Sequence, residues 1–424
     1  MKKRINLIII ILIVLCLIVS TTLLIFVIIP NINRKEEKKK QEELIKNAVI
    51  KVELKEDLNI PFGSEAHVSD YIESINGELI KDKEINTESL GKKEISFRYK
   101  NDDGIEIPYK FDITVYDDVP PLIWMGGSIS VSVGYNGNIA DNIMCADNET
   151  VKPNCYVEGD YDINTPGKYP VVMKAKDKSG NESSKEFTLN VYEPKPVEEN
   201  NDPQPQPVNT HRTDIKDIIK KHKKDNVSIG IDVSGWQGEI DYEAVKNAGV
   251  EFVFIKVGGE KGIDGEYYVD SKFIRNIEGF NNVGIPVGVY IFSYAKNKQQ
   301  AHTEALWVID QIKNYKVDLP LVFDWENWGD FHEFNMSLYD LYASAKEFVK
   351  VAQDHGYQGS TYGSKNYLQN AWLGVPGVIW LAHYNDETSY KGHTFWQICD
   401  DGLVDGINAR VDIDIWYKEV DNNG

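Results

Sequence analysis

The 424-residue sequence predicts a multidomain chain: an N-terminal transmembrane helix, two all-β sandwiches and a C-terminal α/β domain folded as an irregular (β/α) barrel. Three observations support this fold class. An almost uninterrupted apolar run lies near the N-terminus, a stretch of about 70 residues occurs twice, and apolar strands alternate with helix-like stretches in the last part of the chain. At about 100–200 residues per domain, the length allows two to four domains.

The apolar run, residues 5–29, contains only four polar side chains, and about 20 residues are enough for a helix to cross a bilayer. A cleaved signal peptide has a shorter apolar region that ends at a small-residue site, and this run continues without one. We therefore expect residues 1–30 to form a cytoplasmic N-terminus and an uncleaved anchor that contacts the lipid bilayer through residues 5–29. The Lys- and Glu-rich residues 31–48 would follow as a solvated juxtamembrane segment.

An internal repeat follows the charged segment. LGKKEISFRYKNDDG from Leu90 and PGKYPVVMKAKDKSG from Pro166 lie 76 residues apart, as do FDITVY and FTLNVY. Matching residues farther upstream lie 71 apart, so the second copy carries a five-residue insertion. Apolar and polar residues alternate in both copies and Gly, Asn, Asp and Pro interrupt them, which predicts short strands packed as β-sandwiches. We place the two copies at residues 49–116 and 117–192.

Two of the four cysteines, Cys145 and Cys155, lie in the second copy with nine residues between them. A disulfide between them would persist outside the cell, and the alternative is two unpaired cysteines in a loop. The nearby DNET sequence at residues 147–150 lacks the spacing of an EF-hand, so we expect a solvated turn there. The histidines show no zinc-binding spacing, and we predict neither a metal nor a cofactor.

A Pro-rich linker and a change in the hydrophobic pattern mark the start of the C-terminal domain. Five prolines within residues 193–211 predict an extended linker over residues 193–227, followed by the C-terminal domain at 228–424. Strands such as SIGIDVS, PVGVYIFSY and LPLVFDWE alternate there with helix-like stretches, which predicts a mainly parallel sheet or barrel. About 196 residues is close to the lower limit for a βα barrel, so we expect a shortened or irregular one. The net charge of −20 argues against nucleic acid as a partner, because phosphate contacts need clustered Lys and Arg.

Carboxylates gather where the predicted strands end, which is where parallel α/β folds place functional side chains. Asp324 and Glu326 end LPLVFDWE, and residues i and i+2 of a strand point to the same side. Two close carboxyls raise one pKa, which leaves a protonated acid beside an ionised partner, as a glycosidase needs. Taken alone, such a pair is more often a solvated acidic loop after a strand, because D-x-E sequences are very common. Other candidates at comparable places are Asp232, Asp412, Trp236, Tyr290, Trp325, Tyr362, Tyr384, Trp396 and Gln397.

The order of several motifs resembles a known family. GIDVSGWQG, FVFIKV, PVGVYIFSYA, LVFDWE, STYGSKNYL, IWLAHYN, FWQI and VDIDIWY make residues 229–417 similar to the family 25 glycoside hydrolases, lysozyme-type muramidases of phages, bacteria and fungi. The second repeat, through DDVPPLI, TPGKYPVVMKAKDKSGNESS and FTLNVYEP, resembles the bacterial immunoglobulin-like domains of surface proteins, and the first repeat resembles them less.

The family resemblance implies roles for individual residues. Glu326 would be the general acid, and Asp324 would orient the N-acetyl group of the substrate, which is thought to act as the nucleophile. Asp232 and Asp412 would complete an acidic floor. Residues expected to bind substrate are Tyr290, Trp325, Tyr362, Tyr384, Trp396 and Gln397. Asp414 stands where the family often has Asn, and we expect it to point outward at the surface.

The resemblance implies a peptidoglycan hydrolase that cleaves the β-1,4 bond between N-acetylmuramic acid and N-acetylglucosamine, and the apolar run implies that it is membrane-anchored. Because peptidoglycan lies outside the membrane, we expect a single-pass protein of the cell membrane of a Gram-positive cell, with its C-terminal domains extracellular and facing the wall. One alternative is a non-catalytic glycan-binding or adhesion protein on the same fold. Another is an N-acetylglucosaminidase or a chitinase. The sequence identifies no protein partner and does not separate spacer from adhesive repeats.

Overall fold

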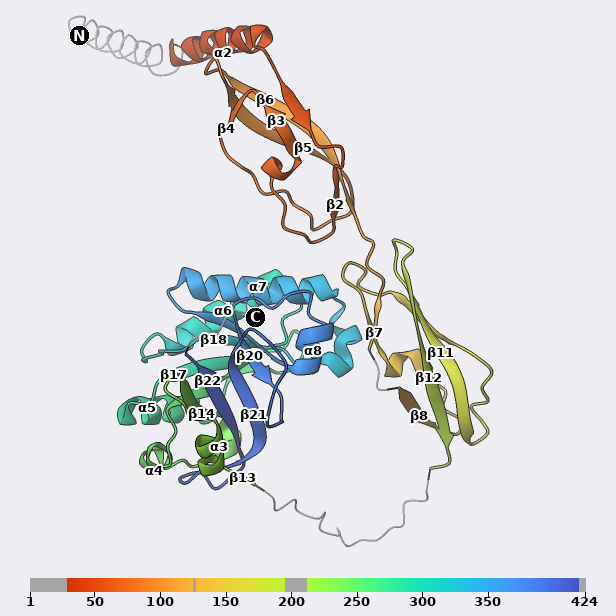
Figure 1. The fold of residues 1–424 in the computed structure, drawn as a ribbon, viewed down its shortest axis with the longest axis vertical. Coiled ribbons are helices and arrows are strands. Elements are labelled where there is room, and N and C mark those ends of the chain that lie inside the picture. The colour runs from red at the N-terminus through yellow and green to blue at the C-terminus, as the bar shows by residue number, and fades with distance from the viewer. Residues whose placement is uncertain (1–28, 125–126, 195–211, 419–424) are drawn as a thin grey trace, which may run out of the picture. The chain divides into compact units, whose positions relative to one another are not determined.

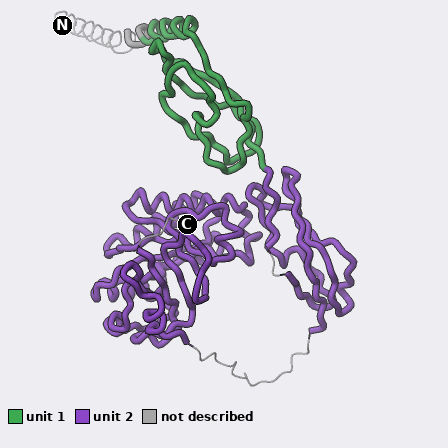
Figure 2. Tube along the Cα trace, in the orientation of Figure 1, with its two compact units in different colours: residues 1–117 green, residues 118–424 purple. Residues whose placement is uncertain are grey.

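The computed structural model describes residues 29–124, 127–194 and 212–418. The chain divides into two compact units, residues 1–117 and residues 118–424 (Figure 2). The first unit contains the first repeat. The second unit contains both the second repeat and the C-terminal barrel, which form one compact unit.

The first described element is a polar helix, α2 (Ile29–Asn47), in which ten of 19 residues are charged. Across the three described ranges, no helix combines the length and the apolar character needed to cross a membrane. This finding corrects the predicted transmembrane helix, the predicted bilayer contact and the predicted single-pass membrane localisation. Residues 5–28, on which those predictions rested, lie outside the described residues.

The first repeat consists of a two-stranded and a four-stranded sheet. Its strands are β1 (Val52–Leu54), β2 (Asn59–Pro61), β3 (Ile72–Ile75), β4 (Gly77–Leu79), β5 (Gly91–Asn101) and β6 (Glu106–Tyr116). β1 pairs with β3, and the larger sheet has the order β2-β6-β5-β4. β2 runs parallel to β6, while the other neighbours are antiparallel. Every second residue of the long strands enters one apolar core, which includes Phe97, Tyr99, Ile107 and Phe111.

The second repeat has the same strand order, so the sequence repeat is a repeat of topology. Its strands are β7 (Leu122–Trp124), β8 (Ser128–Ser132), β9 (Met144–Ala146), β10 (Asn154–Glu158), β11 (Gly167–Lys176) and β12 (Glu182–Tyr192). β7 pairs with β9, and the larger sheet has the order β10-β11-β12-β8 with β8 parallel to β12. A short 3-10 helix precedes β3 and β9 at matching places. The immunoglobulin-like resemblance stays a prediction.

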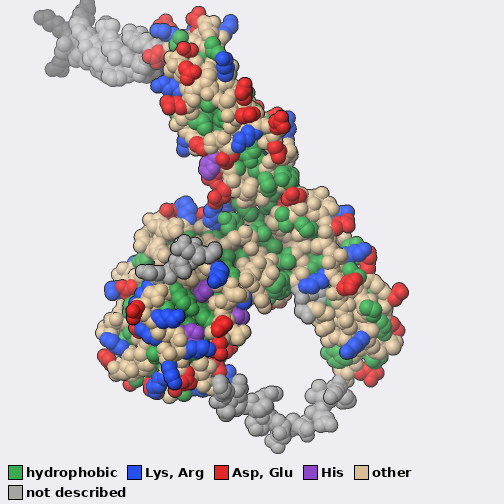
Figure 3. All heavy atoms as spheres, in the orientation of Figure 1, with side chains coloured by type: hydrophobic (Ala, Val, Ile, Leu, Met, Phe, Trp, Pro, Cys, Tyr) green, Lys and Arg blue, Asp and Glu red, His purple; other side chains and the backbone are tan. Residues whose placement is uncertain are grey.

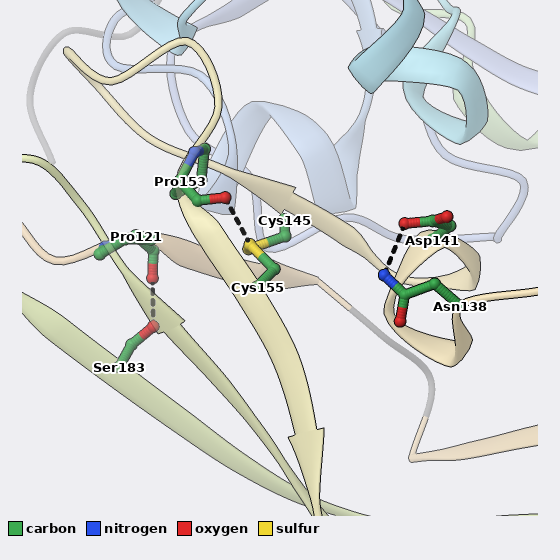
Figure 4. The surroundings of a disulfide bond; sticks show 7 residues. All are labelled: Pro121, Asn138, Asp141, Cys145, Pro153, Cys155 and Ser183. Atoms are coloured by element: carbon green, nitrogen blue, oxygen red, sulfur yellow. Dashed lines mark hydrogen bonds between the residues drawn. A yellow bond between two sulfur atoms is a disulfide. The ribbon is translucent and has the colours of Figure 1, made fainter.

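The five-residue insertion falls between β9 and β10 of the second repeat. Seven residues separate these two strands, whereas one residue separates the equivalent strands β3 and β4 of the first repeat. A disulfide joins Cys145 to Cys155 across the base of this longer loop (Figure 4). Nearby, the Ser183 hydroxyl donates to the Pro121 carbonyl over 2.6 Å and ties β12 to the start of β7. The insertion therefore forms a covalently closed loop at one end of the second repeat.

The C-terminal domain is a closed barrel of eight strands (Figure 1). The strands are β14 (Val227–Val233), β15 (Phe252–Glu260), β17 (Val287–Phe292), β18 (Leu321–Asp324), β19 (Gly359–Ser364), β20 (Val378–Ala382), β21 (His393–Leu403) and β22 (Val411–Tyr417). β14 to β21 pair in parallel in this order, and β22 closes the ring by pairing antiparallel with both β14 and β21. The short strands β13 (Thr213–Asp214) and β16 (Tyr267–Val269) extend β21 and β15.

This closure corrects the predicted (β/α) barrel. Helices follow only the earlier strands: α4 (Tyr242–Asn247), α5 (Phe273–Val283), α6 (Lys298–Ile312), α7 (Leu338–Asp354) and α8 (Lys365–Asn370). Within the fully described stretch 378–417, the connections after β20 and β21 hold no helix. The seven residues between β21 and β22 are fewer than the dozen or more of a helical crossover, and β22 pairs antiparallel with both β21 and β14.

The predicted linker is shorter than expected. Residues 195–211 lie outside the described residues, whereas Arg212 and the residues after it belong to the barrel. The Arg212 guanidinium donates to the Gly402 carbonyl over 2.8 Å, and β13 pairs with β21. Helix α3 (Ile215–His222) then buries Ile215 and Ile218 against the sheet.

Two layers of side chains follow from the two-residue period of the barrel strands. The outer layer is aliphatic and packs under the helices. The inner layer is mostly aromatic, and its buried members are Phe252, Phe254, Leu319, Val322, Tyr362, Trp380, Ala382 and Phe395. The barrel interior is therefore a packed core, and functional groups must lie above it, at the carboxyl ends of the strands. On the face shown in Figure 3, acidic and basic side chains are interspersed.

Candidate active site

The inner face of the barrel changes from aromatic to acidic toward the carboxyl ends of its strands. On β18, Val322 belongs to the inner aromatic cluster, so Asp324 two residues later points to the same side. Asp232 near the end of β14 is buried in the same way. Glu326 follows β18 directly and is exposed to solvent. We call Asp232, Asp324, Glu326, Asp412 and Asp414 the acidic cluster.

The antiparallel strand β22 contributes the last two members of the acidic cluster. Asp412 pairs in register with Asp232, and Asp414 pairs with Gly230. Asp414 is fully buried, and the indole N–H of Trp380 donates to its Oδ1 over 2.8 Å. The expectation that Asp414 points outward is therefore wrong. Its side chain lies inside the barrel because β22 closes the ring and turns alternate residues inward.

A glutamine holds the acidic cluster in place. The Gln397 side-chain amide donates to Asp232 Oδ2 over 2.8 Å. Its carbonyl oxygen accepts hydrogen bonds from the Tyr362 hydroxyl (2.9 Å) and the Tyr384 hydroxyl (3.0 Å). Both ends of the amide are thus engaged, and Asp232 has one defined orientation.

Loss of hydration raises the pKa of every carboxyl in the acidic cluster, and nearby negative charges add to the rise for each of them except Glu326. Loss of hydration is the largest cause for each of them. For Asp412, burial and the nearby Asp232 raise the pKa to about 9. For the contacting pair Asp324 and Glu326, the positive charge of Lys256 opposes the rise in pKa. The cluster therefore binds protons at neutral pH, and the Asp324–Glu326 pair titrates as a unit.

The structure separates the predicted substrate-binding residues into two groups. Tyr290, Tyr362, Tyr384 and Gln397 lie on the inner side with the acidic cluster, and each of the three tyrosines has its pKa raised chiefly by burial. Trp325 and Trp396 do not join them.

Trp325 and Trp396 belong to the outer layer instead. Trp325 is fully buried against Trp328 and Phe334, and Trp396 is buried with its indole N–H donating to the His383 carbonyl. Trp325 follows the inward-facing Asp324, and Trp396 precedes the inward-facing Gln397. Adjacent residues of a strand point to opposite faces, so both tryptophans point outward. Their assignment to substrate binding is corrected on this ground.

Sequence reasoning missed Lys256, which lies on β15 two residues after the inward-facing Phe254. Its ammonium group packs 4.8 Å from the ring centroid of Phe292 and lowers the pKa of both Asp324 and Glu326. The signal was a single cation within an otherwise apolar strand. Since an apolar strand buries its side chains, a lysine there requires a nearby carboxylate.

Sequence reasoning also missed a second hydrogen-bond network, which holds the end of β18 and the residues after it. The Ser293 amide donates to the Asp324 carbonyl over 2.7 Å, and the Ser293 hydroxyl donates to Glu304 Oε2 over 2.7 Å. The Asn327 side chain donates to the Ser293 carbonyl over 3.3 Å. Glu304 is fully buried, and burial raises its pKa to about 8. These bonds fix the backbone on both sides of Trp325.

Comparison with known proteins agrees with this geometry. Residues 231–407 match the family model "Glycosyl hydrolases family 25". An autolytic lysozyme of Clostridium acetobutylicum is 27% identical over 194 residues, which cover 44% of this chain and 54% of that protein. Lysozyme M1 of Streptomyces globisporus is 28% identical over 199 residues, which cover 43% and 65%. The chain thus spans about half the length of the first of these curated relatives.

A solved family 25 glycosyl hydrolase from Bacillus anthracis is 23% identical, with 50% of this chain and 94% of that chain covered and a TM-score of 0.41. The family match begins one residue before Asp232 and includes Asp324 and Glu326. The predicted enzyme class, a glycoside hydrolase, is confirmed by the match of residues 231–407 to the family 25 glycosyl hydrolases.

Proposed function

We propose that this protein hydrolyses the β-1,4 bond between N-acetylmuramic acid and N-acetylglucosamine in peptidoglycan. The observation that supports this most directly is the contacting pair Asp324 and Glu326, whose pKa values are raised at the carboxyl end of the barrel. Such a pair supplies a proton and a negative charge at one place, and glycoside hydrolysis requires both. The two relatives named above are lysozymes by name.

Glu326 is the general acid in this proposal. It is the exposed member of the pair, so it can reach the glycosidic oxygen. Loss of hydration raises its pKa, while the hydrogen bond with Asp324 and the charge of Lys256 oppose the rise. Asp324 is buried beside it, and in this proposal its ionised form stabilises the developing oxocarbenium ion. The Lys256 ammonium favours the ionised forms of both carboxyls and so opposes the rise in their pKa.

The contact between the two carboxyls bears on the nucleophile. An inverting glycosidase separates its carboxyls by about 6.5–9.5 Å to leave room for water. Asp324 and Glu326 instead share a hydrogen bond. We therefore assign the nucleophile to the N-acetyl carbonyl oxygen of the substrate, with Asp324 orienting its amide N–H. Water then opens the oxazolinium ring, and the Glu326 carboxylate takes the proton of that water.

Trp236 extends the proposed substrate surface. It lies on the 3-10 turn Gly235–Gln237 directly after β14, and 88% of it is exposed. The turn is rigid, because the Gly235 amide donates to Asp270 Oδ2 and the Gln237 side chain donates to the Arg410 carbonyl, each over 3.0 Å. An exposed indole on a fixed turn is suited to stacking on a sugar ring.

We expect Trp236→Ala to raise KM for soluble peptidoglycan fragments roughly fivefold, the equivalent of about 1 kcal/mol of ring stacking. The value of kcat should stay within about twofold, because the indole does not touch the reacting bond. Initial rates against fragment concentration measure both constants. Trp236→Phe is the matched control and should retain most of the affinity. An unchanged KM in Trp236→Ala would remove Trp236 from the substrate surface.

The bond that is cleaved can be identified directly. The full chain is incubated with native peptidoglycan and with N-deacetylated peptidoglycan, the products are reduced with borohydride, and mass spectrometry identifies the new ends. We expect muramitol ends from the native substrate and a strongly reduced yield from the deacetylated one. Glucosaminitol ends would assign a different bond, and no new ends from folded protein would indicate a non-catalytic glycan-binding module.

A further inference from the structure

We propose that the second repeat is a positioning element of the catalytic strand, not a spacer. Its β7–β9 sheet and its closed insertion loop, residues 147–153, would hold residues 325–339 in the geometry that hydrolysis requires. The inference assigns an interaction surface and a role in catalysis to a module outside the family 25 match. Its kinetic consequence rests on the proposed function, whereas its structural consequence does not.

An unbroken chain of aromatic contacts leads from the second repeat to the catalytic pair. The ring of Trp124 on β7 lies 5.5 Å from that of Tyr367 on α8. Tyr367 stacks on Trp328 at 4.4 Å with an interplanar angle of 5°, and Trp328 meets Trp325 edge-on at 5.0 Å. Trp325 lies between Asp324 and Glu326 in the sequence. A shift of the repeat is therefore transmitted to the backbone that carries both carboxyls.

The insertion loop also completes helix α7 of the barrel. The Leu338 amide donates to the Asp147 carbonyl over 2.8 Å, and the Tyr339 amide donates to the Asn148 carbonyl over 3.2 Å. Both amides belong to the first helical turn, whose N–H groups have no partner within a helix. Ala146, at the end of β9, is 1% exposed and belongs to the core cluster of the barrel. The second repeat thus supplies backbone acceptors and a core residue to the catalytic domain.

The loop is built to stay rigid. The disulfide between Cys145 and Cys155 closes it, and Asp147 Oδ2 accepts the amides of Glu149 (3.0 Å) and Thr150 (2.7 Å). Asp147, Asn148 and Thr150 are buried, so the expected solvated turn at residues 147–150 is wrong. The first repeat has no such insertion. Of the two described repeats, the second carries a loop closed by a disulfide.

The segment that the loop contacts is the one most able to disturb catalysis. It runs from Glu326 through a 3-10 helix (Trp328–Phe334) to α7 and buries Trp328, Phe331 and Phe334. The Trp328 amide donates to the Glu326 carbonyl over 2.8 Å. The position of Glu326 depends on this backbone and on the hydrogen bond of its side chain with Asp324. Removing the repeat's contacts should displace Glu326 before it unfolds the barrel.

The test compares full-length variants by hydrogen exchange and by kinetics. Trp124→Ala removes the first ring of the aromatic chain, Trp124→Phe retains a ring, and Leu54→Ala truncates the equivalent strand end of the first repeat as a matched control. Cys145→Ser/Cys155→Ser opens the loop without changing the barrel. Exchange in β11 and β12 shows whether the second repeat of each variant stays folded.

We expect Trp124→Ala and the double cysteine variant to speed exchange at the amides of Leu338 and Tyr339 at least tenfold. Their kcat should fall at least tenfold with little change in KM, because small displacements of a reacting group are costly, and the pH–rate profile should shift. Trp124→Phe and Leu54→Ala should resemble the wild type. A purely structural role would leave kcat per folded molecule and the pH profile unchanged.

Each result decides a different question. Unchanged exchange and unchanged kcat in folded Trp124→Ala and in the double cysteine variant would overturn the positioning role while leaving the muramidase proposal intact. If the wild type releases no reducing ends, the proposed function fails, and the exchange rates at Leu338 and Tyr339 still decide whether the repeat holds the barrel. Faster exchange at Leu338 and Tyr339 with an unchanged kcat and pH profile would mean that the contact between the second repeat and the barrel is only structural. That result would overturn the inference.

Discussion

Replacing Glu326 by Gln is expected to lower kcat/KM for peptidoglycan by roughly 1000-fold, within the range that a general acid contributes. Glutamine keeps the size of the side chain and its place beside Asp324 but has no proton to give to the glycosidic oxygen. The folded state should not weaken, because the substitution removes a carboxyl whose pKa the fold raises. Release of reducing ends measures the first effect, and urea unfolding followed by tryptophan fluorescence measures the second.

Two companion variants make the assignment specific. Asp324→Asn should cause a loss of similar size, since it removes the negative charge that stabilises the oxocarbenium ion and orients the N-acetyl group. Asp330→Asn, on the exposed part of the same loop, is the matched control and should retain wild-type activity. If Glu326→Gln retains more than about a tenth of the activity, the loss is smaller than a general acid contributes, and the role of general acid belongs to another carboxyl. Asp412, with its pKa raised to about 9, would be the next candidate.

The same-face rule for strands accounts for what the sequence could and could not predict. It places Asp324 and Glu326 together, and the structure brings these two carboxyls into contact. Applied to VDIDIWY, it would also have placed Asp414 on the same face as Asp412. The expectation of an outward Asp414 did not apply this rule. The errors at Trp325 and Trp396 have the same origin, because they were grouped with their sequence neighbours and not with the residues two positions away.

Other features depend on contacts between distant segments. The pairing of β22 with both β14 and β21 decides that the barrel closes antiparallel, and no local pattern in β22 shows which strands it will join. The contact between Asp147 and Leu338 joins residues of different modules. The sequence did show that the second repeat carries an insertion and two cysteines. It could not show that this loop completes a helix of the catalytic domain.

Burying the acidic cluster inside the closed barrel lowers the free energy of unfolding, and Asp414→Asn should reveal this loss of stability. Asp414 is fully buried, and its pKa is raised well above the usual carboxyl value by burial and by the charge of Asp412. Asparagine retains an oxygen that can accept the Trp380 indole N–H, and its NH2 group can donate to Asp232. We expect the free energy of unfolding at pH 8 to rise, by roughly 1.4 kcal/mol for each pH unit, up to pH 8, by which the folded pKa of Asp414 exceeds its unfolded value.

The pH dependence gives this prediction its sign. The carboxyls of the acidic cluster have higher pKa values in the folded state than in the unfolded state, so the folded protein holds protons that the unfolded chain releases. Their contribution is fully present below the ordinary carboxyl pKa of about 4 and is lost as the pH rises through the folded values, to about 9 for Asp412. Asp414→Asn removes one of these groups and should flatten the decline.

Urea unfolding at pH 5, 7 and 8 tests the prediction, because urea leaves the ionic strength unchanged. Eight of the nine tryptophans lie in the C-terminal domain, so their fluorescence reports on the barrel. Asp330→Asn should follow the wild type at each pH. Destabilisation by Asp414→Asn at all three would mean that the Asp232–Asp414 hydrogen bond outweighs the cost of charge. A gain confined to high pH would mean that the barrel gives up stability to keep the catalytic carboxylates in an acidic, water-poor interior.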